Sequence, residues 1–190
     1  DKEDSAAEYY EDILKGIDED LRDFVCKSVF LTDIYPEICR AALGINNAEV
    51  LISQAGCINP ISNTETGNMY YSAGFARYCS DTFPETGLRV RRSAFDYCAK
   101  NGRVKEAVIY SVLTGDTENI STVLRNNTEK FYDTLKCSDA DMLMDMIDGE
   151  YDMYCRFVKT ACQLKNGLFE EAMESAKYLC DNAERVDSRI

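Results

Sequence analysis

The stretches AKNGRVKEA, residues 99–107, and LKNGLFEEA, residues 164–172, share the frame Lys-Asn-Gly-x-x-x-Glu-Ala. Asn and Gly enter the left-handed backbone conformation that closes a helix more readily than other residues do. Glu and Ala follow a turn later, where a carboxylate suits the positive end of a new helix and Ala allows close packing. We therefore predict that each stretch is a corner between two helices and carries no reactive groups.

Apolar residues recur at spacings of three and four along most of the chain, as expected for amphipathic helices. The longest such pattern runs from Tyr9 to Val25, after the capping sequence Ser5-Ala6-Ala7-Glu8, and Gly16 is expected to bend it. Turn-forming residues are dense only in GCINPISNTETGN, residues 56–68. We predict an all-α fold of about ten short helices in one domain over residues 1–190, with a long loop near 56–68.

The second corner resembles tetratricopeptide and Sel1-like helical repeats, whose turn and second helix often contain Gly-x-Tyr/Phe-x-Glu-Ala. Gly167, Phe169, Glu171 and Ala172 match this pattern, whereas the first corner has Val104 at the aromatic position. The resemblance covers about nine residues at each corner and implies an array of helical hairpins. The first helix of such a repeat departs from the pattern, because its bulky and Leu-Gly positions fall on Arg156, Lys159 and Thr160. The sequence leaves two arrangements open, a compact helical bundle and a degenerate array of helical hairpins.

The charge of the chain argues against nucleic acid as a partner. Its formal net charge is −13, and a negative field repels phosphate backbones and anionic lipid surfaces. No stretch approaches the roughly 18 consecutive apolar residues of a membrane-spanning helix, so no transmembrane segment is predicted. The sequence begins at Asp1, as expected for a mature product of leader cleavage or for a trimmed chain.

Catalysis is disfavoured because the chain has no histidine, the usual general base near neutral pH. The acidic run SDADMLMDMIDGEYDM, residues 138–153, invites comparison with a calcium loop. Counted from Asp139, however, the fifth and sixth loop positions are Leu143 and Met144, where an EF-hand needs an oxygen ligand and Gly. We predict a helix there, and we predict no catalytic residue, no metal site and no cofactor.

Nine cysteines are spread through the chain without a Cys-x-x-Cys pair, so they are interpreted either as disulfides of an oxidising compartment or as packed, reduced thiols. The sequons at Asn119 and Asn126 lie seven residues apart and are expected to share a helix face. They favour glycosylation and a secreted or extracytoplasmic location, with a cytoplasmic location as the alternative.

Helix geometry suggests two disulfides. Cys155 and Cys180 lie at similar distances from the Asn166-Gly167 corner, and Cys26 and Cys39 flank a turn near Leu31 in the same way. An odd count leaves a thiol that is free or bonded to another chain, and Cys162 is the leading candidate.

Three functions remain as predictions. The first is a non-enzymatic, secreted or luminal protein that presents a helical surface to a protein partner. The second is a carrier of a small hydrophobic ligand in a helical cavity. The third is a reduced intracellular adaptor of helical repeats.

Overall fold

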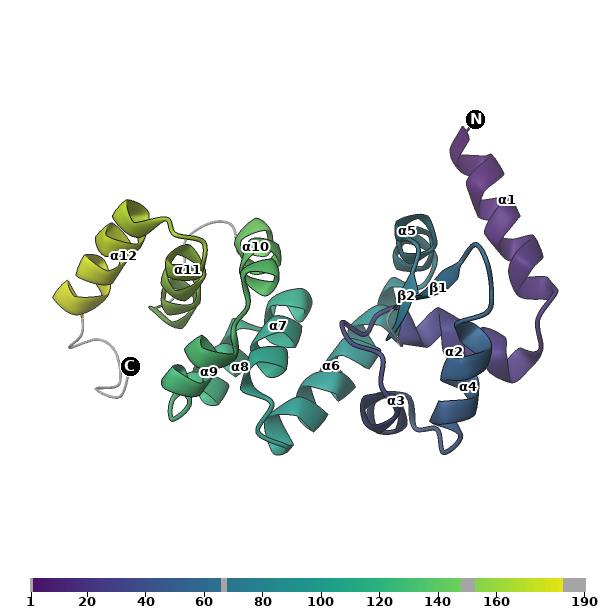
Figure 1. Ribbon diagram of the computed structural model, residues 1–190, viewed down its shortest axis with the longest axis horizontal. Coiled ribbons are helices and arrows are strands. Elements are labelled where there is room, and N and C mark those ends of the chain that lie inside the picture. Colours follow the sequence, from purple (N-terminus) through teal and green to yellow (C-terminus); the bar gives the residue numbers. More distant parts are fainter. Residues whose placement is uncertain (1, 66–67, 148–152, 183–190) are drawn as a thin grey trace. The chain divides into compact units, whose positions relative to one another are not determined.

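The computed structural model describes residues 2–65, 68–147 and 153–182 (Figure 1). Twelve helices and one two-stranded hairpin occur in that part of the chain, so the predicted all-α class is confirmed. The chain, expected to form one domain, groups into two compact units, Asp1–Tyr97 and Cys98–Ile190. Each unit is described by itself below.

The first unit contains five helices, a hairpin and most of a sixth helix. These elements are α1 (Lys2–Lys15), α2 (Glu19–Ser28), α3 (Pro36–Leu43), α4 (Ala48–Ala55), β1 (Ser62–Glu65), β2 (Asn68–Tyr71), α5 (Ala73–Thr82) and α6 (Pro84–Lys100). Its core takes apolar residues from several helices, with Phe24 from α2, Ile38 from α3 and Phe75 from α5 almost completely buried. The amphipathic spacing in the sequence thus places one face of each helix inward.

One helix was expected from the Ser5 capping sequence to Val25, and the structure has two. Helix α1 begins at Lys2, upstream of Ser5, and ends at Lys15. Helix α2 then begins at Glu19, because the Asp18 side chain accepts a hydrogen bond of 3.0 Å from the backbone N–H of Leu21. An N-cap of this kind satisfies an amide that the first helical turn cannot bond itself.

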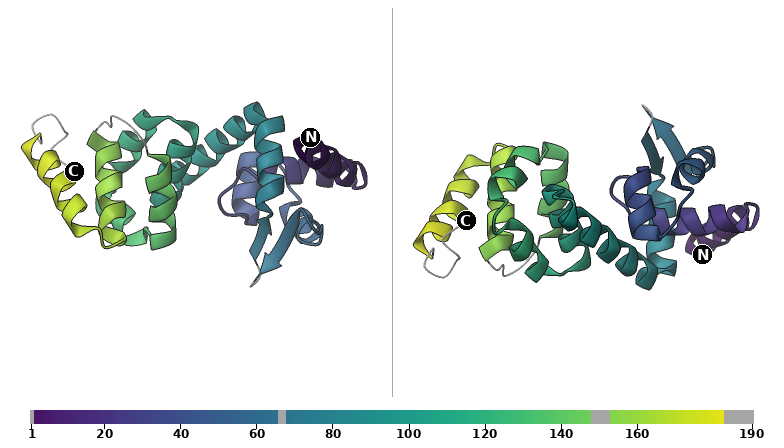
Figure 2. Two further views of the ribbon diagram at one scale, coloured as in Figure 1. Left: turned by 90° about the horizontal axis from the view of Figure 1, so that it is seen from above. Right: turned by 90° about the horizontal axis from the view of Figure 1, so that it is seen from below.

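Part of the predicted loop at 56–68 is a β-hairpin, in which Ser62 pairs with Tyr71 and Glu65 with Asn68 (Figure 2). The Ser62 hydroxyl donates to the Ala55 carbonyl at the end of α4, and Met69 is buried. The strands are four residues long, too short for alternation to stand out from the turn residues around them.

The second unit is wholly helical in its described residues. Its elements are α7 (Val104–Thr114), α8 (Thr117–Leu124), α9 (Thr128–Thr134), α10 (Cys137–Met146), α11 (Met153–Lys165) and α12 (Phe169–Asp181). Helix α7 packs against α8, α9 and α10, and it contributes Tyr110, the largest fully buried side chain. Helices α11 and α12 form an antiparallel hairpin, seen in green and yellow in Figure 1. Within α12, Ala172 alone is buried.

Candidate protein-binding surface

The two predicted corners have the same backbone. Gly102 and Gly167 both adopt the left-handed conformation, with φ of 65° and 74°. In each corner, the glycine amide bonds to the carbonyl three residues earlier, and the next amide bonds to the carbonyl five residues earlier. The hydrogen bonds are Gly102 N–H to Ala99 O (3.3 Å), Arg103 N–H to Cys98 O (2.9 Å), Gly167 N–H to Leu164 O (3.2 Å) and Leu168 N–H to Gln163 O (2.9 Å). This pair of bonds is the Schellman motif, so the prediction that Asn-Gly closes a helix is confirmed.

The alanines of the shared frame are buried as well. Ala107 in α7 and Ala172 in α12 have at most 1% of their surface exposed. The backbone N–H of each alanine also donates to the carbonyl of the residue directly after the corner glycine. These bonds are Ala107 N–H to Arg103 O and Ala172 N–H to Leu168 O, both 3.0 Å. The frame therefore fixes two features, the left-handed glycine and a small side chain at the helix crossing.

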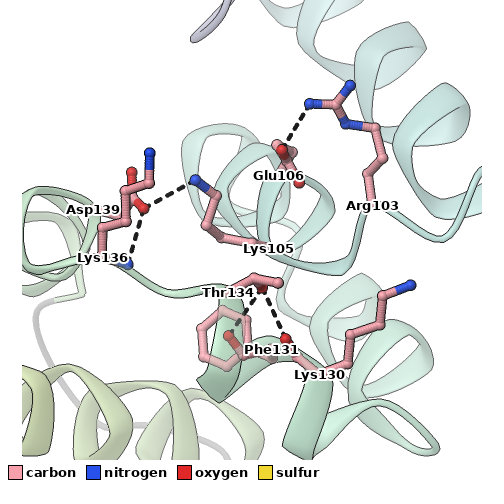
Figure 3. A network of polar contacts seen from close by, with 8 residues as sticks. All are labelled: Arg103, Lys105, Glu106, Lys130, Phe131, Thr134, Lys136 and Asp139. Carbon is pink, nitrogen blue, oxygen red and sulfur yellow. Dashed lines mark hydrogen bonds and ion pairs between the residues drawn. The ribbon is translucent and has the colours of Figure 1, made fainter.

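The first corner is covered by the rest of its unit. Val104 is 4% exposed and Val108 is fully buried. Around them, Lys105 Nζ lies 2.9 Å from the Asp139 carboxylate of α10, and Lys130 Nζ of α9 donates to the Gly102 carbonyl at 2.6 Å. Figure 3 shows these charged side chains grouped around α7. Helices α9 and α10 thus hold the first corner with polar contacts.

The second corner exposes apolar side chains at the equivalent positions. Phe169, which corresponds to Val104, is 66% exposed, and Met173, which corresponds to Val108, is 68% exposed. Leu164 and Leu168, on either side of Gly167, are also exposed. We call these four residues the corner surface. Large apolar side chains that gather in this way commonly mark an interaction site.

A groove between α9 and α11 adjoins the corner surface through Leu164. It encloses about 340 Å³. Its lining residues are mainly apolar or aromatic: Thr128, Glu129, Tyr132, Phe157, Thr160, Ala161 and Leu164. The Lys165 ammonium lies 4.1 Å from the centre of the Tyr132 ring, a cation–π contact at the edge of this groove. Leu164 thus belongs both to the groove and to the corner surface.

Acidic side chains dominate the exposed charged residues of α12. Glu170, Glu171 and Glu174 are exposed on this helix, and Lys177 is its exposed cation. The exposed charge of this helix therefore has the same sign as the formal charge of the whole chain, −13.

Helix α10 contains part of the acidic run 138–153 and contacts both corners. Asp139 pairs with Lys105 and accepts a bond from its own helix start at Lys136 N–H, 3.1 Å away. Asp141 accepts a hydrogen bond of 2.7 Å from the Asn166 side chain in the second corner. The predicted helix is thus present from Cys137 to Met146, whereas Asp148 and Glu150 lie outside the described residues. The described residues contain no group of three or more His, Cys, Asp or Glu side chains that could hold a metal ion.

Neither predicted disulfide is present, and no disulfide joins any of the nine cysteines in the structure. Cys155 is buried, whereas Cys180 is exposed, so a similar distance from the corner does not bring their side chains together. Cys26 faces Cys79 of α5 instead of Cys39. Cys162, predicted to be the odd thiol, is buried in α11.

The two sequons do not share one helix. Asn119 is half-buried in α8, but α8 ends at Leu124, so the exposed Asn126 lies beyond it. The expectation of a common helix face is therefore wrong, and glycosylation at either residue stays a prediction.

Comparisons with protein-family models, with curated proteins and with solved structures found no match for this chain. The likeness to tetratricopeptide and Sel1-like repeats stays a prediction drawn from the two corners. Among the described residues, no helix combines the length and the apolar character needed to cross a bilayer.

Proposed function

We propose that the protein is not an enzyme and binds a protein partner through the corner surface and the adjoining groove. One observation carries this proposal: Phe169 and Met173 are about two-thirds exposed, where the equivalent Val104 and Val108 of the first corner are buried. In the first corner, helices of the same unit cover the equivalent pair. An exposed apolar pair at these positions therefore suggests a surface that a partner covers.

The gain on binding can be estimated from exposed area. Full burial of a Phe or Met side chain contributes about 1.5–3 kcal/mol. Because only part of each side chain is still exposed, Phe169 and Met173 each have about 1–2 kcal/mol to contribute. Such a gain is that of an anchor residue in an interface, and the surrounding contacts then exclude water.

The favoured occupant is an amphipathic helix of another protein with basic residues beside its apolar ridge. The first corner supports a helical partner, because the helices of its own unit pack against α7 there. The exposed Glu170 and Glu174 support basic flanks, since complementary charges speed association and fix orientation. Apolar ridges on helices dock into grooves of this kind through side chains spaced three and four residues apart.

A displayed library of amphipathic helical peptides tests this proposal with the full chain as target. We expect selected peptides to carry Lys or Arg beside an apolar ridge. We also expect the double substitution Phe169→Ser, Met173→Ser to weaken their binding, measured by fluorescence anisotropy, by at least about tenfold, which corresponds to 1.4 kcal/mol. The matched control is Val50→Ser, which changes an apolar residue of α4 that is 56% exposed, and it should leave binding unchanged.

Peptides whose affinity is equal in the double variant and in the wild type would overturn the proposed site. Light scattering covers a second outcome. If the chain forms a concentration-dependent dimer that the double variant abolishes, the surface binds a second copy and the proposed partner is wrong. Since both residues are exposed, the double variant should unfold within about 0.5 kcal/mol of the wild type, so lost binding reflects lost contacts.

The carrier hypothesis is supported by a different feature, a hollow beside the hairpin of the first unit. It encloses about 570 Å³, within the range of small-molecule sites, and its lining mixes polar and apolar residues: Gly56, Cys57, Asn59, Pro60, Ser62, Tyr70, Tyr71 and Ser72. Titration with anilinonaphthalene sulfonate tests it. Saturable binding that Tyr70→Ala weakens supports a carrier, and binding that Tyr70→Ala leaves unchanged contradicts one.

The compartment is a separate proposal. The two sequons support a secreted protein, whereas a structure without a disulfide among its nine cysteines supports a reduced intracellular adaptor. Thiol titration under denaturing conditions, on protein isolated from its natural source, separates the two proposals. About one free thiol is expected of the secreted form, and nine titratable thiols are expected of the reduced form.

A further inference from the structure

Two cysteines far apart in the sequence meet in the first unit. Cys26 lies near the end of α2 and Cys79 lies in α5, and their thiol groups lie within hydrogen-bonding reach of each other. Cys79 is fully buried, whereas Cys26 is partly exposed. Hence one sulfur of the pair is accessible to a reagent in solution, and the other is held behind it.

The surrounding contacts hold α2 and α5 together. Ser28, two residues after Cys26, shares a hydrogen bond of 2.6 Å with the Tyr71 hydroxyl, and its own hydroxyl is bonded to the Phe24 carbonyl. Tyr71 lies just before α5, and its ring centre is 5.6 Å from that of Phe75, which is one turn before Cys79. Tyr71 therefore contacts both the helix that carries Cys26 and the helix that carries Cys79.

The pair is also chemically asymmetric. The hydrogen bond from Cys79 lowers the pKa of Cys26, although burial opposes this. Donating that bond, together with burial and the nearby Cys26, raises the pKa of Cys79. Because the thiolate is the attacking species in disulfide exchange, Cys26 is the first to react and Cys79 the second.

We propose that Cys26 and Cys79 are a redox pair that closes to a disulfide when the protein meets a disulfide oxidant, for which glutathione disulfide is the probe. The Cys26 thiolate attacks one sulfur of glutathione disulfide, forms a mixed disulfide and releases one glutathione thiolate. The Cys79 thiol then loses its proton, attacks Cys26 Sγ and releases the second glutathione. The two cysteines lose two electrons and two protons in total, and the oxidant takes them up as two molecules of glutathione.

Cys39 is the matched comparison inside the same unit. It lies near the Tyr71 hydroxyl, as Cys26 and Cys79 do. Burial, however, raises the pKa of Cys39 to about 12, and the side chain is fully buried. It therefore resists the first step of the exchange.

The test is disulfide mapping of the full chain. The protein is incubated with glutathione disulfide, quenched with an alkylating reagent, digested without reduction and analysed by mass spectrometry. We expect one linked peptide pair that joins Cys26 to Cys79. We also expect a rise in melting temperature of roughly 10 °C, because the bond constrains a long loop of the unfolded chain.

Three variants separate the steps. Cys26→Ser should abolish the link, Cys79→Ala should stop the reaction at a glutathione adduct on Cys26, and Cys39→Ser should leave the link intact. A link between Cys26 and Cys39 in the wild-type protein overturns the proposal. The proposal is also overturned if both Cys26 and Cys79 of the wild-type protein are recovered in the alkylated form. The same holds if Cys26 of the wild-type protein is recovered as the glutathione adduct. The wild-type result decides even if Cys79→Ala folds poorly. The pair lies in the first unit, so this result and the peptide-binding result are independent.

Discussion

The corners at residues 99–107 and 164–172 share a frame and a backbone but differ in what surrounds them. In the first, Val104 and Val108 are buried, and polar ties from α9 and α10 hold the turn. In the second, the equivalent Phe169 and Met173 are exposed, and α12 packs mainly against α11. The difference shows that the frame specifies a turn, whereas the use of the adjoining helix face depends on which helices lie near it.

The residue directly after the glycine also differs between the two corners. Arg103 forms an ion pair of 2.8 Å with Glu106, while the equivalent position of the second corner is the exposed Leu168. A charged residue there suits a closed and self-contained turn. An exposed leucine there adds to an apolar surface, which supports binding at the second corner.

The largest expected effect is the difference between Val108→Asp and Met173→Asp. The first places a carboxylate in a fully buried site and should lower the free energy of unfolding by about 4 kcal/mol. The second changes a residue that is mostly exposed and should cost less than about 0.5 kcal/mol. Urea denaturation followed by circular dichroism measures both. Equal losses would break the comparison, because they would mean that the α12 face is covered.

Enlarging the corner alanine should affect both corners alike. Ala107→Leu and Ala172→Leu each push a bulky side chain into a buried helix crossing, with an expected loss of about 1–3 kcal/mol. Thermal melting of the two variants gives the comparison. If Ala172→Leu is harmless, the crossing of α11 and α12 is looser than that of the first corner.

Replacing the corner glycines should cost less, about 1–2 kcal/mol each, because Ala is strained at positive φ. Gly102→Ala should be the worse of the two. Its new Cβ meets Lys130 Nζ at 3.3 Å, whereas the nearest atom at Gly167 is Phe169 Cε2 at 4.0 Å. Unfolding free energies in urea rank the variants, and the reverse order would contradict the tie from Lys130.

The smallest effect concerns pH and the Arg103–Glu106 pair. Burial alone would raise the pKa of Glu106, but the hydrogen bond and the charge of Arg103 lower it below its ordinary value of 4.5. A lowered carboxylate pKa stabilises the fold above the ordinary value, and this stability is lost as the pH falls through the folded value. Arg103→Leu, which introduces the residue of the second corner, should cost about 0.5–1 kcal/mol at pH 7.

That cost should shrink as the pH is lowered below about 4.5. Unfolding curves of the wild type and of Arg103→Leu at several pH values provide the measurement. A cost that is constant between pH 7 and pH 3 would show that Arg103 acts through packing and not through Glu106.

Local signals predicted helix boundaries well only where one residue dominates. Gly44 and Gly115 end helices in the left-handed conformation, and Pro36 begins α3, so the residue type at each position accounts for the boundary. The break between α1 and α2 was not predicted, because the apolar pattern continues across it, whereas the Asp18 cap begins a separate second helix. Capping bonds of this kind depend on a single side chain, so periodicity does not reveal them.

The cysteine pairing illustrates a different failure. Cys26 and Cys39 are equally distant from a turn, which made them a reasonable pair, but Cys26 meets Cys79 after the chain has passed through α3, α4 and the hairpin. No local spacing encodes that contact. The ties from α10 to the two corners through Asp139 and Asp141 were missed for the same reason.

The sequence by itself determined the helical class and the geometry of both corners, since glycine φ angles and the small alanine act within a few residues of chain. Tertiary structure alone decided that Val104 is covered and Phe169 exposed, and that Cys26 faces Cys79. Burial and thiol contacts are set by helices that are distant in sequence, and the same nine-residue frame is compatible with either outcome.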